Sequence, residues 1–318
     1  MDSIELKGQT YQYAFLNEEN FSDLSYLFQQ VYQLTISTSV LKKKYKPLDA
    51  FSRCFGCFMY TEEGVPISFQ GAIPFRLSNG GEEVFGAQSC DSMTVSGYAG
   101  RGIFSFLALR VDDLLASCNI KFIYGFPNQN SEGILFGKLG WLKTERMTFF
   151  SMNTGSLPLL SFLKLLPAAR NAIHKRALKK LNSFGEIQTA FENSERGESK
   201  LTVIHDHAFF NYKKEANKAI IRFQNGIVWL KISEVIMVGD LAFSEPERVK
   251  DLLNELKQLA RKIGIARVIF QCQAGGRSHA LLKPLLEEKI SWQVGLKPFD
   301  DEIDLKEFVA TYGDLDTF

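Results

Sequence analysis

The residues with the clearest chemical potential lie in a glycine-rich stretch, TVSGYAGRGIFSFL, at 94–107. It carries three glycines, Gly97, Gly100 and Gly102, within six residues. A strand-like run precedes it, and IFSFLALRVDDLLASC within and after it repeats apolar residues at helical spacing. Many proteins hold a phosphate at a glycine turn between a strand and a helix, because backbone amides and the helix dipole attract an anion. The stretch therefore predicts a phosphate-binding turn.

Two familiar phosphate motifs do not fit this turn. A dinucleotide-binding turn has the order G-x-G-x-x-G, which is reversed here, and a nucleoside-triphosphate loop ends in G-K-[ST], which GRGIFS lacks. What remains is a turn whose backbone amides, from Ala99 to Phe104, point inward at a helix N-terminus. Gly100 and Gly102 would let a diphosphate approach the backbone, because no Cβ stands in the way. Arg101 either adds a direct charge or faces solvent.

The turn and a second segment, GFPNQNSEGILFGKLGW at 125–141, together resemble the acyl-CoA-binding motifs of the GNAT superfamily of N-acetyltransferases. The first family motif is Q/R-x-x-G-x-G/A at a strand-to-helix turn, and the second is an asparagine before a short helix ending in K-L-G-F/W. The Gln/Arg position falls on Ala99, the glycine on Gly102 and the last position on Phe104. The resemblance covers residues 10–150, and the C-terminal half is more loosely similar to the second lobe of bacterial two-lobed members.

The resemblance implies that acetyl-CoA binds as the acyl-donor co-substrate, without a metal. Its diphosphate would lie at the turn, and its pantetheine arm would bond backbone amides around Met93 and Val95, in a strand that splays from its neighbour. Asn128 and Ser131 match polar positions of the second motif, where they would contact the arm or cap the short helix. The residues expected to bind acetyl-CoA are Met93, Thr94, Val95, Ala99, Gly100, Arg101, Gly102, Ile103, Phe104, Asn128, Ser131 and Phe136.

Direct attack of an amine on the thioester needs a group that handles the ammonium proton, and an acid helps the thiolate to leave. Asp91, in the strand before the turn, is the candidate base or the charge that holds the amine; a hydrogen-bonded structural aspartate is the alternative. The resemblance places the acid at Phe136, which has no proton to give. Tyr124 is therefore the candidate acid, with Tyr98, water, or no acid at all as alternatives.

Other groups fit specific sites less well. Cys54 and Cys57 form C-x-x-C, but the sequence holds no second pair for zinc. HDH at 205–207 has no recognisable ligand spacing to the other histidines, so we expect hydrogen-bonded or surface histidines. QAGGRSHALL at 273–282 is another glycine turn before a helix. A tight connection is expected there, with a cationic substrate site around Arg277 as the alternative.

The sequence pattern predicts the elements that must position these groups. Apolar spacing predicts a helix over 21–35, hairpin breaks at EEG and NGG, a buried strand in IKFIYGFP and a short helix ending at Gly140. The helix–strand–turn–helix plan recurs in RVKDLLNELKQLARKIGIARVIFQCQAGGRSHALLKPLLEEKISW, which indicates a duplicated fold unless the similarity is chance. LAFSEPERV stands where the first copy has its glycine turn, so the second copy is expected to be degenerate.

We therefore expect an α/β (α+β) protein with a mixed, mostly antiparallel sheet flanked by helices, in two tandem GNAT-like lobes. The expected domains are an acyl-CoA-binding domain at 1–155, a basic helical linker at 156–200 and a second lobe at 201–318. The length of 318 residues suits two domains, and 37 basic against 36 acidic side chains give no reason to expect a nucleic-acid partner.

The N-terminus lacks a signal-peptide pattern, and no apolar run approaches the ~20 residues of a membrane span. Five thinly spread cysteines fit reduced thiols in a cytoplasmic protein, and a homodimer is compatible with these features. The expected function is N-acetyltransfer to a small amine or amino sugar. One alternative is a catalytically weak or inactive CoA-binding regulatory protein, and another is a two-lobed aminoacyl-transferring enzyme, which the basic helix at 164–180 would suit.

Overall fold

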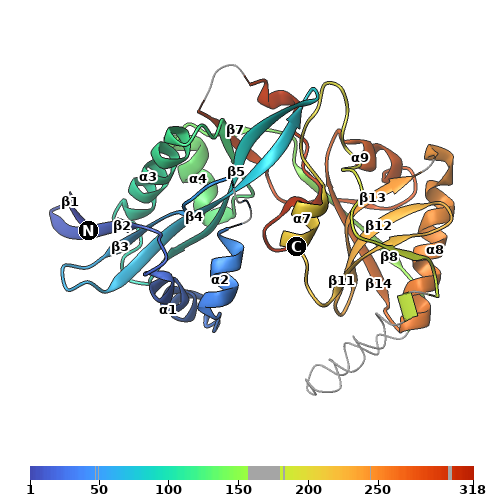
Figure 1. Cartoon of the computed structure of the whole chain (residues 1–318), viewed down its shortest axis with the longest axis horizontal. Helices are drawn as coiled ribbons and strands as arrows, with labels where there is room; N and C mark the ends of the chain where they lie inside the picture. Colours follow the sequence, from blue (N-terminus) through green and yellow to red (C-terminus); the bar gives the residue numbers. More distant parts are fainter. Residues whose placement is uncertain (47, 49, 157–179, 182, 244, 300–302) are drawn as a thin grey trace. The chain divides into compact units, whose positions relative to one another are not determined.

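The structure is a computed structural model of the whole chain, and it describes residues 1–318 except 47, 49, 157–179, 182, 244 and 300–302. The described residues form two compact units (Figure 1). The basic helix expected in the linker falls largely on 157–179 and lies outside the described residues. Unit 1 consists of Met1–Leu77, Glu82–Thr144 and Val294–Lys306, and unit 2 of Ser78–Gly81, Glu145–Gln293 and Glu307–Phe318.

Unit 1 is built on a sheet whose strands follow the order β1-β2-β3-β4-β5-β6-β16-β7. β5 and β6 pair in parallel, whereas β1–β2, β2–β3, β3–β4, β6–β16 and β16–β7 are antiparallel. The hairpin breaks predicted at EEG and NGG are both confirmed. The strands are β1 (Asp2–Leu6), β2 (Gln9–Phe15), β3 (Phe55–Tyr60), β4 (Pro66–Asn79), β5 (Glu82–Thr94), β6 (Phe122–Gly125), β7 (Leu142–Lys143) and β16 (Gly295–Pro298).

Helices cover both faces of this sheet (Figure 1). On β3, Cys57 and Met59 pack into an apolar core with residues of α3 and α4. Tyr60, the next residue along the strand, points to the opposite face, where its hydroxyl donates a hydrogen bond to Asp23 of α1 (2.9 Å). The helices of unit 1 are α1 (Phe21–Tyr32), α2 (Thr38–Lys44), α3 (Ile103–Ser117) and α4 (Gln129–Lys138).

Unit 2 is built on a seven-stranded sheet of order β15-β8-β14-β13-β12-β11-β9, in which β13 and β14 form the parallel pair. Leu252, Leu256, Leu259 and Ile263 recur at helical spacing along α8 and are buried in the core on this sheet. The strands are β8 (Met147–Asn153), β9 (Glu186–Gln188), β10 (Leu201–Val203), β11 (Lys218–Arg222), β12 (Gly226–Ile232), β13 (Ile236–Phe243), β14 (Arg267–Gln273) and β15 (Glu288–Ile290). The helices are α7 (His207–Tyr212), α8 (Val249–Ile263) and α9 (Arg277–Leu282), with short 3-10 turns at Pro246–Arg248 and Tyr312–Asp314. Another 3-10 turn, Leu305–Glu307, lies where the chain passes from unit 1 to unit 2.

The predicted repeat of elements is present. The order β4, β5, α3, β6, α4 in unit 1 corresponds to β12, β13, α8, β14, α9 in unit 2, with one parallel strand pair in each. The expected mixed, mostly antiparallel sheets flanked by helices are confirmed. None of the described helices is long and apolar enough to cross a membrane.

Two strands lie in a different unit from the one their place in the sequence suggests. β8 ends before residue 155, yet it pairs with β14 and β15 in the sheet of unit 2. β16 follows β15 in the chain, yet it pairs with β6 and β7 in unit 1. Sequence periodicity identifies a strand but not its partners, because each partner lies far away in the chain.

Candidate functional site

The three glycines of the predicted turn all adopt left-handed backbone conformations. Their φ angles are 92° at Gly97, 76° at Gly100 and 87° at Gly102, between the end of β5 and the start of α3. A Cβ atom added at any of them would meet no atom within 4 Å. The backbone angle, rather than crowding, therefore requires glycine, and the space beside each Cα is open to a ligand. Ala99 is exposed in the middle of the turn.

The N-terminus of α3 leaves its first backbone amides available. Gly102 is the N-cap, no side chain in the described part of the chain caps the helix, and its first turn contains no acidic residue. Among the described residues, none accepts a hydrogen bond from the amides of Gly102, Ile103 or Phe104. The helix dipole places about half a positive charge at this end. Unbonded N–H groups, positive potential and open space together suit an anion such as a diphosphate.

The side chains of the turn point away from these amides. Phe104 packs against the apolar core of unit 1, so its side chain leaves the backbone approach clear. The Nη1 atom of Arg101 donates hydrogen bonds to Oε1 of Gln9 and to the hydroxyl of Tyr11 (3.2 Å) on β2. The same guanidinium lies 5.0 Å from the ring centroid of Tyr98. Arg101 is thus bound to the neighbouring strand, and its direct contact with a ligand stays a prediction.

β5 and β6 separate next to this turn. Their parallel pairing ends at Gln88 and Tyr124, which lie opposite each other. β6 ends one residue later, at Gly125, whereas β5 continues to Thr94. The part of β5 beyond this point has no paired β6 residue, and we call this unpaired edge of β5 the strand opening. The splay that the GNAT resemblance implies stays a prediction.

Backbone bonding at the end of β5 selects which amides face that opening. The amide of Val95 donates to the carbonyl oxygen of Ile67 on β4 (2.8 Å), and the Met93 carbonyl accepts a bond from the Ser68 hydroxyl (2.7 Å). Alternate residues of an antiparallel strand direct their N–H and C=O groups at the same neighbour. Thr94 therefore directs its N–H away from β4, toward the opening. The amide of Val95, expected to bond the pantetheine, is already engaged by β4.

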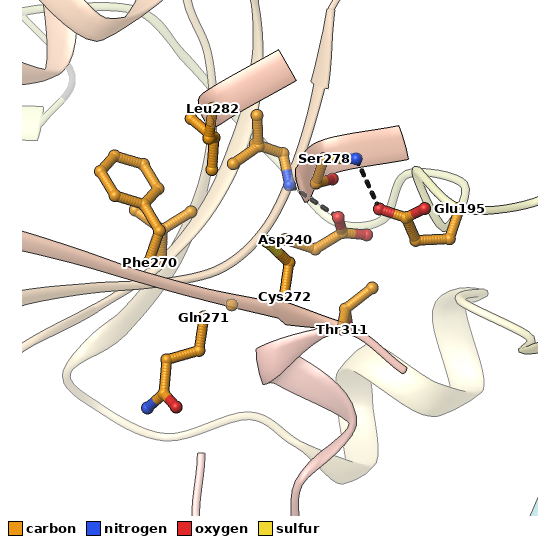
Figure 2. Close-up of a pocket in the computed structure, with 11 residues that line it drawn as sticks. Glu195, Asp240, Phe270, Gln271, Cys272, Ser278, Leu282 and Thr311 are labelled. Carbon is orange, nitrogen blue, oxygen red and sulfur yellow. Dashed lines mark hydrogen bonds between the residues drawn. The ribbon is translucent and has the colours of Figure 1, made fainter. Parts of the chain in front are cut away.

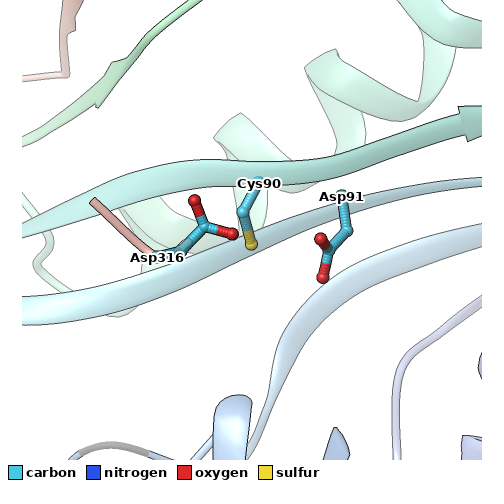
Figure 3. Close-up of side chains that lie close together, drawn as sticks. All are labelled: Cys90, Asp91 and Asp316. Atoms are coloured by element: carbon cyan, nitrogen blue, oxygen red, sulfur yellow. The ribbon is translucent and has the colours of Figure 1, made fainter. Parts of the chain in front are cut away.

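Asp91 lies on this part of β5 in a left-handed conformation, with φ of 50° (Figure 3, with Cys90). Its Oδ1 accepts a hydrogen bond from Nζ of Lys44 (2.8 Å), and its Oδ2 accepts one from the hydroxyl of Tyr45 (2.7 Å). Burial raises the pKa of Tyr45 well above its usual range, and the Asp91 charge raises it further, so this hydroxyl remains a donor. The sequence analysis missed Lys44 and Tyr45, because nothing in KYK connects them to a strand 46 residues away.

The candidate acids lie in different surroundings. Tyr124 is fully buried on β6, at the point where the strands separate, with the ring of Phe126 edge-on at 6.3 Å. Tyr98 is only partly buried and lies beneath the guanidinium of Arg101. Phe136 of α4 carries the Nζ of Lys143 over its ring at 4.8 Å. Of these tyrosines, Tyr124 is the one at the strand opening.

Asn128 and Ser131 cap α4 in a reciprocal capping box. Oδ1 of Asn128 accepts bonds from the amides of Asn130 (2.9 Å) and Ser131 (3.2 Å), and Oγ of Ser131 accepts one from the amide of Asn128 (3.2 Å). This is the capping alternative of the two that the sequence allowed. The cap positions α4 beside the opening between β5 and β6.

In unit 2, side chains fill the position that corresponds to the strand opening of unit 1. Its parallel strands make their last pair at Val238 and Phe270, and a cavity of about 10 Å³, room for about one water molecule, remains beyond them (Figure 2). Asp240 projects there and accepts bonds from the amides of Leu241 (2.7 Å) and Ser194 (3.1 Å). The lining residues are Glu195, Val238, Gly239, Asp240, Leu241, Phe270, Gln271, Cys272, Ser278, Leu282 and Thr311.

Two further carboxyl groups close this region of unit 2. Glu195 accepts bonds from the amides of Arg277 (2.5 Å) and Ser278 (2.8 Å) at the start of α9, so this helix end already holds an anion (Figure 2). The buried ring of His205 lies between Asp240 (Nδ1 to Oδ2, 3.2 Å) and Asp314 (Nε2 to Oδ1, 2.7 Å). The His205 environment confirms the expected hydrogen-bonded histidine.

Cys54 and Cys57 are buried thiols. Burial raises the pKa of both, to about 12 for Cys57. Metal ligation needs the thiolate form, which burial disfavours here. The surroundings of this C-x-x-C are therefore those of cysteines that pack in a core.

No family model and no curated protein matches the sequence, but solved structures match its fold. A GCN5-related N-acetyltransferase from Kribbella flavida is 13% identical, with TM-score 0.58, over 91% of this chain and 71% of that one. Another from Anabaena variabilis is 12% identical, with TM-score 0.56, over 91% and 72%. Saccharomyces cerevisiae N-myristoyltransferase with bound myristoyl-CoA is 10% identical, with TM-score 0.54, over 93% and 82%. The chain therefore has the fold of GCN5-related N-acetyltransferases (GNAT).

Proposed function

We propose that this GNAT-fold protein is an acyl-CoA-dependent N-acyltransferase that moves an acyl group, most simply acetyl, from CoA to a small amine or amino sugar. The observation that carries the proposal is the turn between β5 and α3. Its glycines hold positive φ angles beside open space, at the N-terminus of a 15-residue helix whose first amides have no acceptor among the residues that the structure describes. A fold neighbour described with bound myristoyl-CoA supports acyl-CoA as the ligand class.

In the proposed complex, the diphosphate contacts the turn and the pantetheine arm follows the open edge of β5. The amides from Ala99 to Phe104 bind the diphosphate, and the amide of Thr94 bonds the arm or the thioester oxygen. A backbone donor to the developing oxyanion contributes about 3 kcal/mol of transition-state stabilisation. Met93 and Val95 shape the strand, and Asn128, Ser131 and Phe136 of α4 form the outer border of the arm's path.

The proposed reaction is direct attack of the amine nitrogen on the thioester carbonyl carbon. Asp91 attracts the ammonium group and accepts its proton, which displaces Lys44 from the carboxylate. As the C–N bond forms and the C–S bond breaks, the leaving thiolate takes a proton from the hydroxyl of Tyr124. The nitrogen, which is positively charged once the C–N bond has formed, loses its second proton to water, and that proton returns through water to the Tyr124 oxygen. Holding the two reactants together supplies much of the acceleration, since effective molarities reach ~10⁵ M or more.

A second candidate function is CoA binding without turnover. The observation that favours it is the bonding of Asp91, whose two carboxylate oxygens already accept bonds from Lys44 and Tyr45. An amine would have to replace one of them before Asp91 can take its proton. Release of free thiol from acetyl-CoA, measured across amines, amino sugars and amino acids, separates the two functions, because a pure binder releases none.

Calorimetry with CoA and acetyl-CoA tests the binding step. We expect micromolar to low-millimolar affinity, and Gly102→Glu should abolish it by placing a carboxylate in the turn. Gly81→Glu is the matched control, because Gly81 also has a positive φ, 95°, with no atom within 4 Å of an added Cβ. This control adds the same charge and similar backbone strain just before β5, whereas the glycine turn follows the other end of that strand. Absence of binding by the unmodified protein, or binding by Gly102→Glu, contradicts the proposal.

A further inference from the structure

The hairpin formed by β1 and β2 bonds directly to the glycine turn. Lys7, in the hairpin turn, has a φ of 51°, and its Nζ donates a hydrogen bond to the carbonyl oxygen of Gly100 (2.6 Å). Two residues away, Gln9 accepts a hydrogen bond from the guanidinium of Arg101. The two consecutive residues in the middle of the turn are therefore both held by one hairpin, Gly100 through its backbone and Arg101 through its side chain.

The bond from Lys7 sets the direction of the peptide unit that joins Gly100 to Arg101. In a planar trans peptide, the C=O and N–H groups point in opposite directions. Because the Gly100 carbonyl is held toward the hairpin, the Arg101 N–H is directed away from it. A peptide unit between glycine-rich neighbours has low barriers to other orientations. A reversed unit would present a carbonyl oxygen, with its negative partial charge, where an anion needs an N–H donor.

The side chain of Arg101 provides a second constraint on the same peptide unit. Its acceptor, Oε1 of Gln9, also accepts a hydrogen bond from the hydroxyl of Tyr11 (2.8 Å). Tyr11 is completely buried in the core of unit 1, so this bond ties the acceptor to a rigid part of the protein. The Arg101 guanidinium also lies over the ring of Tyr98. The turn is thus fixed from the hairpin side, and its amide side is left open.

We propose that the β1–β2 hairpin is a positioning element for the anion-binding turn, and that Lys7 orients the Gly100–Arg101 peptide for diphosphate binding. Lys7 acts through Gly100 rather than through the ligand, so it is a positioning residue. The inference rests on the proposed function, because the anion in question is the diphosphate of CoA. It adds a requirement that the turn motif itself does not contain, namely a hydrogen-bond donor 93 residues earlier in the chain.

The test measures CoA affinity by calorimetry for Lys7→Met, Lys7→Arg and Lys250→Met, at low and at high salt. Lys250 is exposed on α8 of unit 2, outside the turn and both motif segments, so its substitution removes the same charge without touching either. Loss of the Lys7 bond should weaken CoA binding about three- to tenfold. Lys7→Arg, which keeps a charged donor, should restore most of the affinity, and Lys250→Met should match the unmodified protein. Lys7→Met should raise KM for acyl-CoA more than it lowers kcat, with an unchanged melting temperature.

The outcomes separate the inference from the proposed function. If the unmodified protein binds CoA and Lys7→Met binds it equally well, the positioning role is overturned while the proposed function stands. A loss that disappears at high salt, or that Lys250→Met reproduces, also overturns it, because long-range attraction alone would then explain the effect. A loss that persists at high salt and is rescued by Lys7→Arg supports it. Failure of the unmodified protein to bind CoA overturns both.

Discussion

The Nζ atom of Lys44 lies 2.8 Å from Oδ1 of Asp91, and this ion pair joins α2 to the part of β5 that has separated from β6. Asp91 holds a left-handed backbone conformation, which costs a non-glycine residue about 1 kcal/mol or more and persists only where the surroundings enforce it. Lys44 and Tyr45 together supply that enforcement. The strained residue, its cation and the opening between the strands thus coincide, which is the basis of the catalytic role proposed for Asp91.

Asp91→Asn should lower kcat by about two orders of magnitude, because an amide cannot accept the amine's proton. Asparagine tolerates positive φ well, so the backbone at position 91 should keep its conformation. The Kd for CoA should therefore change by no more than about twofold, which is a small difference in binding free energy. Lys44→Met is the matched variant, since it removes the partner of Asp91 but leaves the carboxylate. Steady-state kinetics and calorimetry check this prediction, and an unimpaired kcat in Asp91→Asn would assign Asp91 a purely structural role.

Tyr124→Phe should lower kcat about tenfold to a hundredfold, because it removes the proton offered to the thiolate and keeps the ring. Tyr98→Phe serves as the control, since Tyr98 lies in the turn beneath Arg101 rather than at the strand opening. Thiol-release rates measured under saturating acyl-CoA compare the two variants directly. The opposite pattern, with loss in Tyr98→Phe only, would move the acid role to the turn.

A single CoA should bind each chain. Unit 2 has no glycine turn between β13 and α8; instead, this connection carries Pro246, which lacks an N–H, between Glu245 and Glu247. Its strand opening is occupied by Asp240 and its partners, with space for little more than one water molecule. Calorimetric stoichiometry checks this expectation, and Gly102→Glu should remove all binding. Residual binding in that variant would place a second site in unit 2.

Protonated His205 should make stability depend on pH. Burial alone would lower its pKa, but Asp314 and Asp240 outweigh burial and raise it from 6.5 to about 9. The folded state therefore binds the proton more tightly than the unfolded state. The resulting stabilisation, up to about 3 kcal/mol, is complete below pH 6.5 and is lost as the pH rises through 9.

Urea unfolding of the unmodified protein between pH 6.5 and 9 measures how the free energy of unfolding falls as the pH rises. His205→Gln should abolish this pH dependence. His279→Gln is the control, because His279 bonds a partly exposed carboxylate, that of Glu288 (2.9 Å), whereas His205 lies between two buried ones. An equal slope in His205→Gln would show that other groups cause the dependence.

The sequence alone was sufficient for the local features. Three glycines in six residues required a turn of positive φ angles, and each of Gly97, Gly100 and Gly102 has one. The periodicity of IFSFLALRVDDLLASC specified α3, and the order of elements specified the repeat. These features depend on residues that are close together in the sequence, so a short segment is enough to predict each of them.

Only the tertiary structure determined which distant residues meet at the turn and the opening. It brought Lys7 to Gly100 and Lys44 to Asp91, and it placed β16 beside β6. A lysine offers the same donor at every position, and an exposed or partly exposed one has no pattern that marks its partner. The glycine turn could therefore be predicted from its own residues, whereas the donors that hold it and the charge beside Asp91 depend on the packing of elements far apart in the chain.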